Sequence, residues 1–194
     1  MNNRPEILDR VESLGFQVFD SNCDYDLNII GERNPKGRPD HFDDWISVVY
    51  KIRGRWNHEI FRCTTDPGLY WMNNPGRVEG TAILQHNQQM RGAYKLGIHR
   101  GKYMALVQDK PVNVFRDRNM DNIHDYSGPL HRGLFGINIH RASLNTTSKV
   151  GRFSAGCTVI KESRDFDKFM TLCKNQIRHN PTWDHFTYTL IMGL

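Results

Sequence analysis

One cysteine of the chain has neighbours that suit nucleophilic catalysis. Cys157 ends the segment Ser154-Ala155-Gly156-Cys157, and His140 ends the earlier run Gly136-Ile137-Asn138-Ile139-His140. A cysteine nucleophile needs a partner that makes thiolate available near neutral pH, and histidine is the usual one. Cys157 and His140 therefore predict a Cys-His site for acyl transfer.

Gly156 fits the same interpretation. A glycine directly before the cysteine lets the backbone bend so that the N–H groups of Gly156 and Cys157 face one point, where they would stabilise an oxyanion. The tautomer of His140 needs only an acceptor such as a backbone carbonyl, which leaves no mark in a sequence. Cys157 and His140 meet only if a strand, a loop and a second strand return to one place, and Gly151 and Gly156 supply turns for that return.

The elements that must position these residues are mainly β. Apolar and polar side chains alternate in the run that ends at His140, which predicts a half-buried strand. Helices are expected at 5–14 and 163–177, where apolar residues recur at helical spacing. Other strands are expected at 16–19, 27–30, 45–52, 59–64, 81–84, 92–99, 103–108, 112–116 and 186–192, with a hairpin through Gly54. We predict a single mainly β (α+β) domain over residues 1–194, a curled sandwich or barrel with flanking helices.

Composition limits the class of protein. Of the 194 residues 38% are hydrophobic and 11% aromatic, which is enough for a core and excludes a disordered, collagen-like or coiled-coil chain. The net charge is +5, but the basic residues are scattered, so no nucleic-acid partner is expected. No apolar stretch approaches the roughly 20 residues of a membrane span. The start of the chain does not read as a signal peptide, so we expect the protein in the cytoplasm of the cell that makes it.

The four cysteines predict free thiols. Cys23, Cys63, Cys157 and Cys173 form no C-x-x-C pair, so a zinc ribbon or a thioredoxin site is not expected. Cys173 falls on the apolar face of the second predicted helix and is expected in the core.

The histidine and the cysteine segment resemble the catalytic signature of the YkuD-type L,D-transpeptidase family. The resemblance rests on Ile139-His140, Val150-Gly151 and Ser154-Ala155-Gly156-Cys157. It implies a β-rich sandwich fold, a cysteine acyl-enzyme, no metal or other cofactor, and peptidoglycan stem peptides as the substrate. It also implies that residues 81–194 are the catalytic core and that residues 1–80 form an N-terminal helix and β-hairpin region.

The resemblance also implies roles for single residues. Cys157 would be the nucleophile, His140 the base, Gly156 an oxyanion donor, and Ser154 a structural or substrate-facing hydroxyl. Thr158-Val159 replaces the hydrophobic residue and Arg or Asn of the family, and Ala155 replaces a residue that is often polar there. Hydrolysis is therefore expected in preference to cross-linking.

Three further residues are candidates for substrate binding. His99 ends a strand-like run as His140 does, and Arg116 and Arg132 could pair with the carboxylates of stem peptides.

The stretches 92–99 and 102–108 are similar to those of phage-encoded proteins that carry this cysteine segment. A phage lysin accumulates in the host cytoplasm and acts on the cell wall after release, and we expect this protein to do so as a monomer. Two alternatives stay open. The first is a non-catalytic wall-binding or virion structural protein with a decayed site. The second is a zinc peptidase built from His124, His131 and His140.

Overall fold

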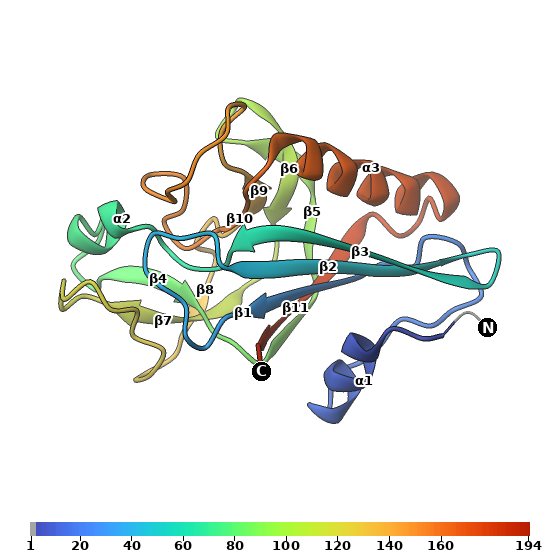
Figure 1. The fold of residues 1–194 in the computed structure, drawn as a ribbon, viewed down its shortest axis with the longest axis horizontal. Helices are drawn as coiled ribbons and strands as arrows, with labels where there is room; N and C mark the ends of the chain where they lie inside the picture. The colour runs from blue at the N-terminus through green and yellow to red at the C-terminus, as the bar shows by residue number, and fades with distance from the viewer. Residues whose placement is uncertain (1–2) are drawn as a thin grey trace.

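A closed eight-stranded barrel is the main feature of the computed structural model, which describes residues 3–194 (Figure 1). Neighbouring strands follow the order β1-β11-β5-β6-β9-β10-β3-β2. The pairs β1/β11 and β9/β10 are parallel, and the other neighbours are antiparallel. The bounds are β1 Asn28–Arg33, β2 Asp44–Ile52, β3 Arg55–Thr64, β5 Gln88–His99, β6 Tyr103–Gln108, β9 Ile139–Arg141, β10 Thr158–Ile160 and β11 His185–Met192. Residues before and after position 80 thus contribute to one closed sheet.

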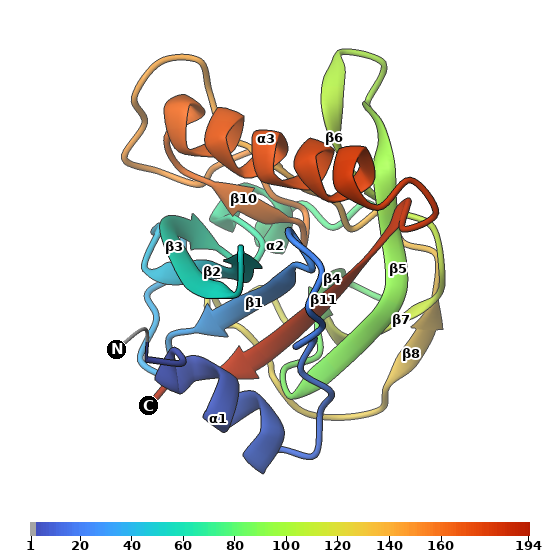
Figure 2. The same ribbon diagram turned by 90° about the vertical axis from the view of Figure 1, so that its right-hand side faces the viewer.

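A second, three-stranded sheet and three helices complete the fold. The sheet has the order β4-β7-β8, with β4 Thr81–Leu84, β7 Val112–Asp117 and β8 His131–Gly133. The helices are α1 Glu6–Ser13, α2 Leu69–Asn73 and α3 Ser163–His179, and α1 and α3 lie on opposite sides of the barrel (Figure 2). No helix within residues 3–194 has the length and apolar character needed to cross a membrane.

The core fills the barrel and continues under α3. Phe166 and Phe169 of α3 belong to the same buried cluster as Ile139, Ile160 and Tyr188 of the barrel strands. Because side chains alternate along a strand, the residues next to these inward-facing ones point to the outer face of the wall. The outer face of β1, β2 and β11 is covered by α1, whose Ile7, Leu8 and Val11 pack against Ile30, Val49 and Ile191.

Most of the predicted elements are confirmed, and two predictions need correction. The segment 16–19 is not a strand, because the N–H groups of Gln17 and Phe19 bond to the side chains of Gln89 and Asn28 instead of a neighbouring strand. The run that ends at His140 forms a strand only over Ile139–Arg141. The N–H groups at 137 and 138 bond to side chains of Gln108 and Cys157. The short helix α2 was not predicted.

All four cysteines are free thiols, as predicted. Cys23 is exposed, whereas Cys63, Cys157 and Cys173 are buried. Cys173 belongs to the core cluster under α3, which confirms its predicted place.

Candidate active site

The parallel pair β9/β10 brings His140 and Cys157 to one face of the barrel wall. Val159 is paired with His140, and the N–H of Thr158 donates to the carbonyl of Asn138 at 3.1 Å. Paired residues of parallel strands point to the same side, and alternation then places Cys157 and His140 on the outer face. Ile139 and Ile160, by contrast, face the core. His140 and Cys157 are therefore diagonal neighbours on adjacent chain segments.

His140 is held as a neutral imidazole with a free lone pair. Its Nδ1 lies 2.8 Å from the carbonyl oxygen of Arg141, which can only accept, so Nδ1 carries the proton. The hydroxyl of Tyr103 donates to the same carbonyl at 3.2 Å. Nε2 is buried and has no hydrogen-bond partner within residues 3–194. Burial, followed by the neighbouring His99, lowers the pKa of His140 to about 3.

His99 stacks on His140 and is oriented by Asn138. The two imidazole rings are 4.0 Å apart between centroids, with an interplanar angle of 21°. The side-chain oxygen of Asn138 accepts from the N–H of Gln108 at 2.9 Å, so its amide nitrogen faces Nδ1 of His99 at 3.0 Å. Burial lowers the pKa of His99 as well, helped by Arg100 and Lys102. Both rings are therefore neutral at neutral pH.

Cys157 rests as a neutral thiol in a small apolar cluster. It is 9% exposed and packs with Phe42, Ala142, Val150 and Val159. Its Sγ accepts the backbone N–H of Asn138 at 3.4 Å, and the thiol donates to the carbonyl of Gly136 at 3.5 Å. Burial raises the pKa of Cys157 to about 11, against the smaller opposing effect of the Asn138 amide. The site thus starts from thiol and imidazole and not from an ion pair.

The turn before Cys157 is fixed by Ser154 and Gly156. The buried hydroxyl of Ser154 accepts from the N–H of Gly156 at 3.1 Å and donates to the carbonyl of Cys157 at 2.8 Å. Gly156 has φ +117°, and a Cβ at this position would collide with the carbonyl oxygen of Ala82. No hydrogen bond of the Cys157 N–H is found among residues 3–194. Cys157 rather than Gly156 therefore presents the amide that could face an oxyanion.

Two pockets border this turn. One has a volume of about 590 Å³ and is lined by His140, His99 and Tyr103 together with Arg152 and Phe153 from the turn. The other has a volume of about 240 Å³ and is lined by Ala155 from the turn and by Trp71, Arg116 and Phe135. Cys157 itself lines neither pocket. A substrate bound across this turn would place one part in each pocket.

The two candidate arginines are placed differently. Arg116 lines the smaller pocket, its guanidinium donates to the carbonyl of Gly80 at 3.0 Å, and its Nε is buried without a partner among the described residues. Arg132 lies on β8, lines neither pocket, and donates to the side chain of Asn113 at 3.4 Å. The structure therefore brings Arg116 to the turn and leaves Arg132 apart from it.

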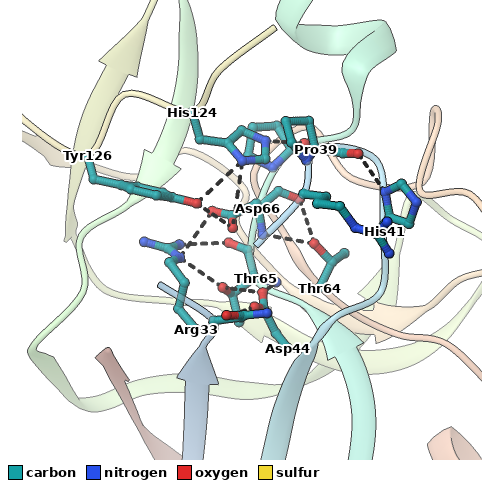
Figure 3. A network of polar contacts seen from close by, with 12 residues as sticks. Arg33, Pro39, His41, Asp44, Thr64, Thr65, Asp66, His124 and Tyr126 are labelled. Carbon is teal, nitrogen blue, oxygen red and sulfur yellow. Dashed lines mark hydrogen bonds and ion pairs between the residues drawn. The ribbon is translucent and has the colours of Figure 1, made fainter. Parts of the chain in front are cut away.

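A buried polar network surrounds Arg33 and Asp66 (Figure 3). The side chain of Arg33 is 0% exposed, donates to the hydroxyl and the carbonyl of Thr65 at 3.0 and 2.9 Å, and forms an ion pair with Asp66 at 3.1 Å. Tyr126 donates to Asp66 at 2.8 Å, and Asp44 accepts from the N–H and the hydroxyl of Thr65 at 2.7 and 2.8 Å. Burial, followed by repulsion from Asp66, raises the pKa of Asp44 to about 7.

This network positions the loop after β3, which contacts the turn before Cys157. The imidazole of His124 lies 3.0 Å from the carbonyl of Pro67, and the N–H of Gly68 donates to the carbonyl of Ser154 at 2.9 Å. Asp40 accepts the N–H of Gly151 at 2.5 Å from the other side. The loop after β3 therefore connects the network to the segment that carries Cys157.

The zinc alternative has no site in the part of the chain that the structure describes. His124 belongs to the buried network, His131 is exposed on β8, and His140 lies on β9. No three His, Cys, Asp or Glu side chains within residues 3–194 gather closely enough to hold a metal ion.

Sequence reasoning missed several residues of the site. Asn138 bonds through its backbone to Cys157 and through its side chain to His99, and Tyr103 supports the carbonyl that orients His140. Alternation along the run 136–140 would have found Asn138, because it places residues 138 and 140 on one face. No local signal marks Tyr103, which reaches the site through the pairing of β6 with β9, whereas Arg141 directly follows His140 on β9.

No protein-family model matches the chain, and no curated protein or solved structure is significantly similar to it.

Proposed function

We propose that the protein catalyses cysteine-dependent acyl transfer on peptidoglycan stem peptides, with hydrolysis of a peptide bond as its reaction. The observation that carries the proposal is the register of β9 and β10, which brings His140 and Cys157 to one face of the wall. His140 is oriented there by the carbonyl of Arg141, and its Nε2 has no hydrogen-bond partner within residues 3–194. A nucleophile, a base and a group that orients the base are the three parts that covalent catalysis requires. The resemblance to the YkuD-type family supplies the fold type and the substrate class.

The first half of the reaction acylates Cys157. Sγ attacks the scissile carbonyl carbon, and its proton passes to Nε2 of His140 as the S–C bond forms. Since thiol and imidazole are both neutral at rest, this proton transfer accompanies the attack. The oxyanion accepts a hydrogen bond from the N–H of Cys157. The C–N bond then breaks, and His140 delivers the proton to the leaving amine.

The second half releases the acyl group to water. A water molecule gives a proton to Nε2 of His140 and attacks the thioester carbonyl. The C–S bond breaks, and the proton returns from His140 to Sγ. The products are a carboxylic acid and the free amine, and the site is restored.

The remaining candidate residues have supporting roles in this proposal. Ser154 holds the turn, His99 holds the ring of His140 by stacking, and Arg116 pairs with a carboxylate of the acyl part of the peptide. Arg132 has no role in this geometry. All these residues come from one chain, and we propose that it acts as a monomer, as a phage lysin that reaches the wall after release from the host cytoplasm.

Digestion of purified peptidoglycan tests the proposal. The wild-type protein is expected to release new amino groups, and Cys157→Ala and His140→Ala are expected to abolish the release with unchanged circular dichroism. Mass spectrometry of the products identifies the bond that is cut. Release that survives Cys157→Ala would contradict the proposal.

The burial of Cys157 favours one alternative function. A thiol that is 9% exposed in an apolar cluster also suits a decayed site in a non-catalytic wall-binding or virion structural protein. That function predicts binding to insoluble peptidoglycan that neither substitution alters, without release of amino groups.

A further inference from the structure

The chain leaves β7 through a segment in which oxygen-bearing side chains alternate with other residues. Four of these side chains follow the pattern D-x-N-x-D-x-x-x-D; they are Asp117, Asn119, Asp121 and Asp125. Calcium loops of the EF-hand type take side-chain ligands from positions 1, 3, 5 and 9 and the backbone carbonyl of position 7, which is Ile123 here. Position 6, where such loops turn sharply and hold glycine, is Asn122 with φ +65°. Residues 117–125 therefore have the ligand spacing and the turn of a calcium loop.

Asp117 presents to this loop a buried carboxylate oxygen that lacks a partner. The residue is 0% exposed, and its Oδ2 accepts the backbone N–H of Asp125 at 3.4 Å. Its Oδ1 is buried and has no hydrogen-bond partner within residues 3–194. Burial raises the pKa of Asp117, and the nearby charges of Asp125 and Asp121 add to this rise. A buried carboxylate oxygen without a donor is costly, and a bound cation would satisfy it.

The side chain of Asn119 lies between two of the carboxylates. Its amide nitrogen donates to Oδ2 of Asp121 at 3.2 Å and to Oδ2 of Asp125 at 3.0 Å. With the amide in this orientation, the three carboxylates are not gathered closely enough to hold an ion. A cation that replaces the amide nitrogen would meet both carboxylates, and rotation of the amide would add the oxygen of Asn119 as a further ligand.

The carboxylates of this loop also lack a cation from the protein. None of Asp117, Asp121 and Asp125 forms an ion pair with a basic side chain within residues 3–194. Carboxylates that lie close together without a counter-charge repel one another, and a divalent cation removes this repulsion.

The end of the loop connects it to the network around Arg33. His124 and Tyr126, which flank Asp125 in sequence, both face Asp66 (Figure 3): Nδ1 of His124 lies 3.9 Å from its carboxylate, and the hydroxyl of Tyr126 donates to it at 2.8 Å. His124 also lies 3.0 Å from the carbonyl of Pro67. An ion held by Asp125 would therefore restrain both residues that hold Asp66.

We propose that residues 117–125 bind Ca²⁺ through the side chains of Asp117, Asn119, Asp121 and Asp125 and the carbonyl of Ile123, and that the ion holds His124 and Tyr126 against Asp66. All these ligands are oxygen atoms, and a flexible loop suits Ca²⁺ better than Mg²⁺, which demands octahedral geometry. Position 12 is Gly128 and supplies no bidentate carboxylate, so we expect a dissociation constant of about 10⁻⁴ to 10⁻³ M. The ligands line neither pocket beside Cys157, so the inference does not depend on the proposed function.

Calorimetric titration of CaCl₂ into the full chain, first freed of metal ions with a chelator, tests the site. The wild-type protein should bind one ion, and MgCl₂ should bind about 10-fold more weakly or less. Asp121→Asn changes an exposed ligand, so the fold should be kept while Ca²⁺ binding weakens about 10-fold or more. Asp167→Asn, which removes an exposed carboxylate of α3, should bind as the wild type does. Absence of binding up to 10 mM CaCl₂, or equal binding by wild type and Asp121→Asn, would overturn the site.

Thermal unfolding gives a second measure of the site. At a CaCl₂ concentration 10 times the dissociation constant, the melting temperature of the wild type should rise by about 3–6 °C, because the ion binds only the folded chain. Asp121→Asn should show a rise of about 1 °C or less. A rise that NaCl of equal ionic strength reproduces would overturn the site in favour of general charge screening.

Tyr126→Phe tests the connection to the network. This variant keeps every ligand and removes only the hydroxyl that donates to Asp66. Because coupling between two interactions is reciprocal, its Ca²⁺ affinity should fall about 5-fold. An affinity equal to that of wild type would overturn the connection while leaving the ion site in place.

Discussion

The site around Cys157 and the network around Arg33 differ in how their buried polar side chains are partnered. In the network, the buried Arg33 bonds to Thr65 and pairs with Asp66, which in turn accepts from Tyr126. At the site, Nε2 of His140 is buried without a hydrogen-bond partner among residues 3–194, and the residue lines an open pocket of about 590 Å³. A buried polar group that lacks a partner costs folding free energy, which makes Nε2 of His140, at a pocket, a candidate for contact with a ligand.

The Arg33 network contributes to the stability of the fold, whereas the Cys157 site carries the proposed chemistry. The network positions the loop that supports the turn before Cys157, whereas the site holds the groups that would react with substrate. Substitutions in the two regions should therefore have different consequences.

The largest effect is expected from Cys157→Ala. Without its nucleophile, the protein should lose about 10⁴-fold or more of its peptidoglycan hydrolysis, because a covalent mechanism has no substitute for Sγ. Release of amino groups measures the loss, and the melting temperature should change little. Cys23→Ala, which removes the exposed thiol, is the matched control and should keep full activity.

The second effect is a loss of stability from Arg33→Met. Asp66 would then be a buried carboxylate without its cation, and we expect a decrease of about 3–5 kcal/mol in the free energy of unfolding. Denaturant unfolding measures the change. Arg91→Gln at the barrel surface should stay within about 0.5 kcal/mol of wild type. A wild-type unfolding curve for Arg33→Met would contradict the structural role of the network.

The third effect is a pH dependence of opposite sign in the two regions. His140 has a folded pKa of about 3, below its ordinary 6.5, so the unfolded chain binds more protons between these values and stability falls as the pH falls through this window. Asp44 has a folded pKa of about 7, above its ordinary 3.8, so its contribution is full below 3.8 and is lost as the pH rises through 7. Each contribution amounts to about a few kcal/mol.

Unfolding between pH 3 and 8 distinguishes these contributions. Relative to wild type, His140→Gln should gain stability as the pH falls from 6.5 toward 3, and Asp44→Asn should gain stability as the pH rises from about 4 to 7. If either variant keeps the wild-type pH profile, the environment assigned to that residue is wrong.

The smallest effect concerns access to the thiol. Val150 packs on Cys157, and Val150→Ala should increase the rate of iodoacetamide labelling of Cys157 several-fold by uncovering Sγ. In the wild-type protein at pH 7, Cys23 should react first, because burial raises the pKa of Cys157 to about 11. Peptide mapping of the labelled protein reports both rates. Equal labelling of the two cysteines in the wild type would contradict the burial of Cys157.

The sequence predicted the elements of this fold better than their assembly. Alternation and helical spacing found most strands and the helices α1 and α3, because these patterns are local. The segment 136–138 was assigned to a strand incorrectly, since side chains of Gln108 and Cys157 take its N–H groups. The Arg33 network could not be predicted, because it joins β1, the loop after β3 and residues near 125 that meet only in the folded barrel.

Part of the candidate site was also predictable from local patterns. Cys157, His140 and Gly156 lie in local segments that suggest their chemistry, and the expected carbonyl partner of His140 is that of Arg141. The larger pocket is lined by four cationic residues, Arg100, Lys102, Arg141 and Arg152. They come from the turn between β5 and β6, from β9 and from the segment before Cys157, so no spacing in the sequence joins them.

Rapid acid quenching followed by intact-mass and peptide-mapping mass spectrometry tests the central claim most directly. Wild-type protein mixed with stem peptide should carry a mass increment equal to the acyl fragment, located on the peptide that contains Cys157 and absent from Cys157→Ala. Hydrolysis without any adduct at Cys157, or an adduct on another cysteine, would contradict the account.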